Sequence, residues 1–185
     1  MSNYLAIATV TETIRQKLNE VVSRDISGAS ATALRPFSGA SDLPNPGVNI
    51  YLYQVNHSAA WRNTDLPTRD QNGTVRQRPR AALDLYYLFS FYGNENRLEP
   101  QRVIGSVVRA LHVQPVITHK MIQSAVSSSA FLSGSNLAEE VELVKFTPLS
   151  LSLEELSKLG SLFFQTAYNL SVAYQASAVL IEGTE

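Results

Sequence analysis

The chain has 185 residues, no cysteine and a net charge of −1, from 15 Lys+Arg and 16 Asp+Glu. The length fits one domain, and 44% hydrophobic with 17% charged residues predicts a folded chain rather than a disordered one. The missing cysteines exclude disulfides, thiolate zinc sites and cysteine nucleophiles, and the near-neutral charge argues against a general binder of polyanions.

The first predicted element is an amphipathic helix near the N-terminus. Its apolar residues recur at spacings of three and four, at Ile7, Val10, Ile14, Leu18 and Val21. Asn3 or Ser2 can cap its start, and it should stop near Arg24 because small residues and a glycine follow. Residues 25–47 contain several prolines and glycines and are predicted to form a loop.

Two strands are predicted next, at Val48–Val55 and Ala81–Tyr92. The second is apolar on both faces, which is typical of a central strand that is covered on both sides. Residues 56–80 between them are too long for a hairpin turn and hold the only tryptophan, Trp61, with five arginines. A long loop of this kind is typical of a functional segment.

The remaining predicted elements are three helices and two strands. They are predicted at Glu99–Leu111 (helix), Thr118–Ser127 (helix), Glu140–Phe146 (strand) and Tyr168–Ile181 (strand). A fourth helix is predicted to open at a capping box, in which Ser152 and Glu155 have the S-x-x-E spacing. Its inner stripe is predicted to be Leu153, Leu156 and Leu159. The sequence thus predicts a single α+β domain over residues 1–185, with a mixed or mostly antiparallel sheet of about four long strands flanked by helices.

The neutral total charge hides an asymmetry along the chain. Residues 1–59 sum to 0, residues 60–120 carry nine basic and five acidic groups (+4), and residues 121–185 carry two basic and seven acidic groups (−5). If these segments form opposite faces, one copy can stack head to tail on the next. The alternative is a mixed surface on which the charges average out.

No catalytic motif emerges from the sequence. There is no phosphate-binding glycine motif and no G-x-S-x-G elbow, and the three histidines, His57, His112 and His119, lack the i, i+4 spacing of metal ligands on a helix. We expect no enzyme activity, no cofactor, no metal and no small-molecule substrate. No secretory signal or membrane-spanning run is present, so we expect a cytoplasmic protein without a membrane partner.

Three groups of charged residues remain as candidates. Asp84 lies in the apolar second strand, where we expect it to pair with an arginine, and a tuned carboxylate is the functional alternative. Glu139, Glu140 and Glu142 are predicted to form a solvated acidic face that can serve as an interface. A divalent-ion site is the alternative, but the spacing lacks a calcium-loop pattern.

The third group is the arginine-rich segment, which is predicted to be a protein interface. Arginine and tryptophan are enriched at such interfaces. Intramolecular packing and nucleic-acid binding with Trp61 as a stacking platform are the alternatives, but interleaved Asp65 and Asp70 make nucleic acid unlikely. The candidate interface residues here are Trp61, Arg62, Arg69, Arg76, Arg78 and Arg80.

Four stretches of the chain together resemble a known family. They read VNIYLYQVNHSAAWRNTDLPTR (48–69), RPRAALDLYYLFSFYG (78–93), QRVIGSVVRALHVQP (101–115) and PLSLSLEELSKLGSLFFQTAYNLSVAYQASAVLIE (148–182). As an ordered set they are similar to the cap, or tail-terminator, family of phage-tail-like contractile injection systems of the antifeeding-prophage and virulence-cassette type. Gly160 and Ala167 depart from a tryptophan and a proline common in that family, and some members carry additional C-terminal sequence.

The resemblance implies a fold like that of phage tail terminators and a structural role. It implies a hexameric ring at the baseplate-distal end of the particle that closes the inner tube and the sheath, stops polymerisation and anchors sheath to tube. The implied partners are further copies of the chain, the sheath protein and the inner tube protein. A sheath subunit could add a strand to an open sheet edge, for which Tyr168–Ile181 is the predicted candidate.

Overall fold

The fold is an α+β arrangement of four helices and five strands. A computed structural model describes residues 2–36, 42–61, 72, 80–164 and 169–182, with the backbone alone for 162–164. The helices are α1 (Ala6–Asp25), α2 (Glu99–Val113), α3 (His119–Ser128) and α4 (Leu153–Phe164), with short 3-10 turns η1 (Glu95–Arg97), η2 (Ala130–Leu132) and η3 (Leu137–Glu139). The strands are β1 (Ser30–Thr32), β2 (Gly47–His57), β3 (Arg80–Tyr92), β4 (Lys145–Leu149) and β5 (Ser171–Glu182).

The five strands form one mixed sheet in the order β1-β2-β3-β5-β4. β1 runs parallel to β2, and the other neighbours are antiparallel. The predicted fold class is confirmed, and so is the central position of the doubly apolar strand β3. The prediction that the last strand is an edge is wrong, because β5 is hydrogen-bonded between β3 and β4.

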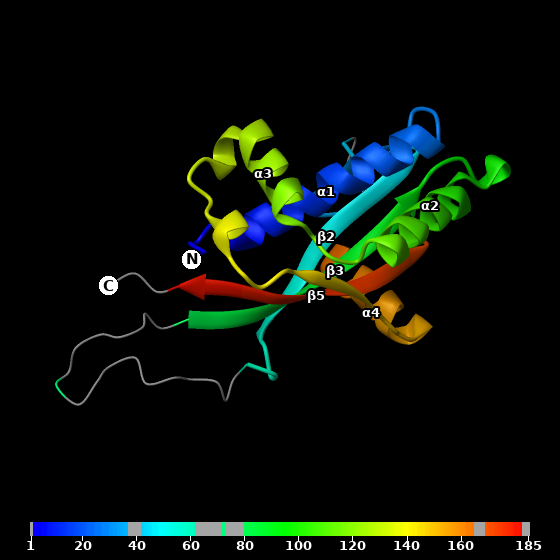
Figure 1. Ribbon diagram of the computed structural model, residues 1–185. Helices are drawn as coiled ribbons and strands as arrows, with labels where there is room; N and C mark the ends of the chain where they lie inside the picture. Colours follow the sequence, from blue (N-terminus) through cyan, green and yellow to red (C-terminus); the bar gives the residue numbers. More distant parts are fainter. Residues whose placement is uncertain (1, 37–41, 62–71, 73–79, 165–168, 183–185) are drawn as a thin grey trace.

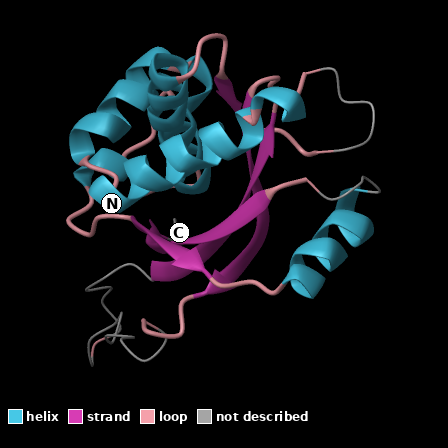
Figure 2. Ribbon diagram, turned by 90° about the vertical axis from the view of Figure 1, so that its right-hand side faces the viewer, coloured by secondary structure: helices cyan, strands magenta, loops and turns pink. Residues whose placement is uncertain are grey.

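Helices α1, α2 and α3 cover one face of the sheet, whereas α4 lies apart on the other side (Figures 1 and 2). Alternate side chains of β3 point from the sheet into the helical layer, where Leu85, Tyr87, Phe89 and Phe91 are buried. Helix α1 packs against both α2 and α3, so it holds the helical layer together.

The core of the sheet is aromatic. The ring of Tyr87 lies 5.7 Å from that of Phe146 on β4, and the ring of Phe89 lies 5.1 Å from that of Tyr174 on β5, centroid to centroid. The Tyr87 hydroxyl shares a 2.8 Å hydrogen bond with Thr11 Oγ1 of α1. Burial raises the pKa of Tyr87, so this hydroxyl stays neutral and ties the sheet to α1.

The first two predicted helices agree closely with the structure. In α1 the fully buried line is Ala6, Val10, Ile14, Leu18 and Val22, so Val22 replaces the predicted Val21 at its end. Asn3 does not cap α1 itself; its side chain accepts a 3.0 Å bond from the Leu5 amide in the preceding turn. In α2, Val103, Val107 and Leu111 are buried as predicted.

Three local predictions need correction. Strand β1 lies in a stretch for which the sequence predicts a loop, because three residues are too few to show a periodicity. The predicted strand Glu140–Phe146 is displaced to Lys145–Leu149, although Val144 and Phe146 are buried as the alternation indicated. The capping box of α4 is confirmed by bonds of 2.7 and 3.2 Å between Ser152 and Glu155, but Leu153 of the predicted inner stripe is 70% exposed.

Glu12 ties α1 to the end of α3. Its carboxylate accepts two 2.7 Å bonds from Arg15, one of 2.8 Å from Gln16 and one of 3.1 Å from Ser129 beyond α3. The carboxylate is nearly buried, and the Arg15 hydrogen bond, opposed by desolvation, lowers its pKa. The stability that this charge contributes is therefore present above the pKa of an unfolded glutamate and lost as pH falls through the lower folded pKa.

We expect Glu12→Gln to lower the free energy of unfolding by about 1.5–3 kcal/mol at neutral pH, because charge-assisted bonds to a nearly buried carboxylate are lost. The difference from the wild type should shrink in acid, where the wild-type carboxyl is protonated as well. Denaturant titrations at the two pH values measure this. Glu20→Gln, exposed on the same helix, serves as the control. A difference that does not depend on pH would contradict the assignment.

We expect Gly47→Ala to destabilise the chain by roughly 1–3 kcal/mol, because a Cβ there would lie 2.1 Å from the Ser30 carbonyl oxygen and 2.6 Å from Pro44 Cβ. The same change at Gly105, where a Cβ meets no atom within 4 Å, should instead stabilise α2 by about 0.5–1 kcal/mol. Thermal unfolding of both variants measures the two changes in stability. Equal effects at the two glycines would contradict the close approach of β1 to β2.

Candidate assembly interface

The arginine-rich segment is described only at its two ends. Trp61 follows β2, is 37% exposed, and its amide donates a 3.3 Å bond to the Ser58 carbonyl. Arg80 begins β3, is exposed, and stands opposite Glu182 of β5 in the ladder. The other predicted interface residues of this segment lie outside the described residues: Arg62, Arg69, Arg76 and Arg78. The structure therefore brings Trp61 and Arg80 to the same end of the sheet, and the interface stays a prediction.

The three predicted glutamates follow one another on the surface but differ in exposure. Glu139 and Glu142 are exposed, whereas Glu140 is only 8% exposed. The Glu140 carbonyl oxygen lies 2.9 Å from His119 Nε2, which fixes the backbone of this segment to α3. The prediction of a solvated acidic face is wrong for Glu140, because its segment folds back onto α3 instead of extending as a strand.

Within the described residues, Asp84 is not paired with an arginine. It lies at an irregularity of the β3–β5 ladder, opposite Asn56 of β2, and is 8% exposed. Its Oδ1 atom has no hydrogen-bond partner, and no described residue forms an ion pair with it. The expected pairing with an arginine is therefore not found among the described residues, and it stays a prediction for the arginines that lie outside them.

The described residues offer no catalytic constellation. Across the described parts of the chain, no group of three His, Cys, Asp or Glu could hold a metal ion. An open groove of about 410 Å³ lies between α1 and α3. There Lys17 Nζ donates to the Gln114 carbonyl oxygen, and burial lowers the pKa of Lys17. A lysine committed to a backbone carbonyl has a structural explanation and needs no substrate.

Sequence reasoning missed two exposed apolar sites that lie beside charged residues. Val141 is 88% and Leu143 41% exposed, next to the predicted glutamates. At the start of α2, Leu98 is 53% exposed beside Arg97 and Arg102. In the strand predicted at 140–146, Val141 and Leu143 would share one face, but another layer can cover a strand face, so the sequence does not predict their exposure.

Comparison with protein families gives a match over nearly the whole chain. Residues 9–185 match the model of the Pvc16 N-terminal domain. The chain belongs to this family. Comparison with curated proteins finds none that matches.

Two solved structures have the same fold as this member of the family. One is the sheath/tube terminator of the PVC extracellular contractile injection system in its extended state, with a TM-score of 0.57, 17% identity, 97% of this chain covered and 57% of that one. The other is the tube-terminating cap of the anti-feeding prophage, with a TM-score of 0.55, 13% identity, 93% of this chain covered and 55% of that one. The present chain thus corresponds to little more than half of either protein.

The family assignment agrees with the resemblance noted in the sequence. One matched structure is the terminator of a contractile injection system, and both are terminators of a tube. Within the described residues, the structure has no helix with the length and apolar character needed to cross a membrane.

We expect Asp84→Asn to raise the free energy of unfolding of the isolated chain by about 1 kcal/mol, because the amide removes a nearly buried charge whose Oδ1 lacks a partner. Urea titration of the two proteins at neutral pH measures the change. The control is Asp25→Asn, which should destabilise, since Asp25 accepts a 2.6 Å bond from Ser106 and pairs with Arg109. A loss of stability in Asp84→Asn would contradict the unpaired carboxylate.

Proposed function

We propose that this protein is the structural cap, or tube terminator, of a contractile injection system. One observation carries the proposal: the Pvc16 N-terminal domain match spans residues 9–185, and the fold agrees with two proteins described as terminators of a tube. The whole described chain acts as a single cap domain in this proposal. In this role the protein ends a polymer and does not convert a substrate, so the role requires neither a cofactor nor catalysis.

The proposed cap is a hexameric ring at the baseplate-distal end of the particle. There it closes on the last layers of inner tube and sheath, stops their polymerisation and holds the sheath to the tube during contraction. Its partners are other copies of the chain, the sheath protein and the inner tube protein, first in the cytoplasm and then in the assembled particle. Support from the molecule itself comes from exposed apolar side chains on a domain with little charge, as expected of a subunit in an assembly.

The alternative of a nucleic-acid-binding module gains no support from the described residues. Four of the five arginines in residues 56–80 lie outside them, and the net charge of −1 does not favour phosphate binding. The absence of a described catalytic or metal constellation likewise adds nothing in favour of an enzyme.

We expect deletion of the gene in a strain that makes the particles to give tubes and sheaths of uncontrolled length, or sheaths that detach and contract early. The reason is that polymerisation then lacks its terminator. Length distributions of purified particles by negative-stain electron microscopy measure this, with the wild-type gene returned in trans as the control. Particles of normal length and stability in the deletion strain would contradict the proposal.

A further inference from the structure

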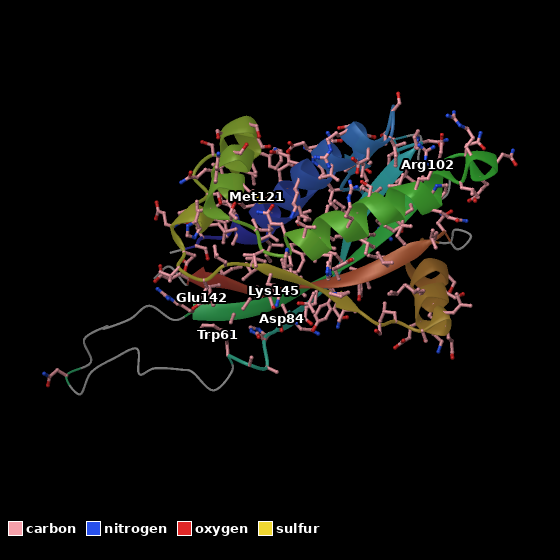
Figure 3. The ribbon with its side chains drawn as sticks, turned by 45° about the vertical axis from the view of Figure 1, so that its right-hand side comes forward. Trp61, Asp84, Arg102, Met121, Glu142 and Lys145 are labelled. Atoms are coloured by element: carbon pink, nitrogen blue, oxygen red, sulfur yellow. The ribbon has the colours of Figure 1, made fainter. Side chains whose placement is uncertain are left out.

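Two exposed apolar surfaces of opposite charge lie at opposite ends of the domain. The acidic end is Glu139, Val141, Glu142 and Leu143, just beyond η3. The basic end is Arg97, Leu98, Arg102 and Arg109, at η1 and along α2. Figure 3 labels Glu142 at one end of the domain and Arg102 at the other, and in Figure 1 the start of α2 and the segment that precedes β4 are likewise far apart.

The acidic end is an apolar projection with a fixed backbone. Val141, at 88% exposure, and Leu143, at 41%, point to solvent between carboxylates. On one side the Glu140 carbonyl is held by His119, and on the other the Ile117 amide donates a 2.9 Å bond to the Val144 carbonyl. Since the backbone is held on both sides, binding through this projection costs little conformational entropy.

The basic end is a row of side chains along the exposed side of α2. Within α2, residues 102, 105 and 109 follow one another at spacings of three and four, so Arg102, Gly105 and Arg109 share one face, and the exposed Leu98 immediately precedes the helix. Gly105 leaves space at the centre of the row, since a Cβ there would meet no atom within 4 Å. Apolar Leu98 at one end and a gap between two arginines make a surface into which an apolar side chain can insert.

The backbone at Leu98 is strained. Leu98 has a positive φ of 52°, which costs a residue with a branched side chain about 1–2 kcal/mol, and its side chain is 53% exposed. In the described structure this strain presents an apolar side chain to solvent at the start of α2 without burying it. The same conformation closes the C-terminal end of η1, where the Leu98 amide donates a 3.1 Å bond to the Glu95 carbonyl oxygen.

The three arginines of the basic end differ in whether they already form an ion pair within the chain. Arg109 is bound to Asp25, and Arg97 Nε lies 3.6 Å from Glu99 Oε1. Arg102 is exposed and forms no ion pair with any described residue. Arg102 is therefore the cation of this surface that remains available to an acidic partner.

We propose that the acidic end of one copy of this chain binds the basic end of the next copy, with Val141 inserted beside Leu98 and Glu142 facing Arg102. The occupant is a second copy because this chain itself carries both complementary surfaces, and because they lie at opposite ends. Two different surfaces in contact make a heterologous interface, which repeats from copy to copy and closes into a ring when the rotation between copies permits. The inference deepens the proposed ring and rests on it.

Single charge reversals test the proposed pair. Glu142→Arg and Arg102→Glu each place like charges in contact in every interface, so self-association of the full chain should weaken roughly tenfold per interface. Mass photometry and analytical ultracentrifugation over a range of concentrations at low salt measure the shift. The matched control is Glu20→Arg, at an exposed residue of α1 that belongs to neither surface; it changes the charge by the same amount and should leave association unchanged.

Mixing the two single variants gives the sharper result. Each variant repels its own copies. In the mixture, the new arginine of Glu142→Arg faces the new glutamate of Arg102→Glu. The other contact in the mixture keeps the native pair of Glu142 and Arg102. An equimolar mixture should therefore assemble like the wild type, in alternating order, where neither variant assembles alone. A mixture that stays as dissociated as its components would overturn the proposed pair.

The outcomes separate this inference from the function on which it rests. If the wild-type chain associates and both reversals associate equally well, the ring survives and the surface pair is wrong. If the wild-type chain does not self-associate even at high concentration and low salt, the proposed ring fails first. Val141→Ser, which keeps all charges, should weaken association as well, and an unchanged association constant would overturn the role of the apolar insertion.

Discussion

The burial of β3 on both faces is the constraint on which the rest of the structure depends. Its alternate side chains place Tyr87, Phe89 and Phe91 under the helical layer, while Leu88 is buried on the opposite face. A strand with two apolar faces is stable only when it is paired on both sides and covered on both faces. That requirement accounts for β2 and β5 as its neighbours and for α1 and α2 above it.

The sequence predicted the four helices and the three long strands, and it missed or displaced the two short strands at the edges of the sheet, β1 and β4. Helices α1 and α2 and strands β2, β3 and β5 bury continuous apolar stripes, so periodicity identified them. Strand β1 has three residues and is recognised only through its pairing with Gly47. Strand β4 extends through Pro148, which a sequence reading excludes from a strand but which an edge position tolerates, because one side of the strand needs no amide donor.

The candidate site was less predictable for a physical reason. Residue type indicated that Glu142 and the arginines have an interface role, but exposure and availability depend on tertiary contacts. Glu140 is buried by the contact of its segment with α3, and Arg109 is occupied by Asp25. The charge asymmetry along the sequence has a partial structural counterpart, since Arg102 of the basic middle segment and Glu142 of the acidic last segment lie at opposite ends of the domain.

The position of the protein on the particle tests the account most directly. Particles purified from a strain that carries an epitope-tagged copy would be labelled with gold-conjugated antibody and imaged by electron microscopy. A cap gives label at one end only, opposite the baseplate, on extended particles. Label along the length of the sheath, at the baseplate, or absent from intact particles would contradict the account.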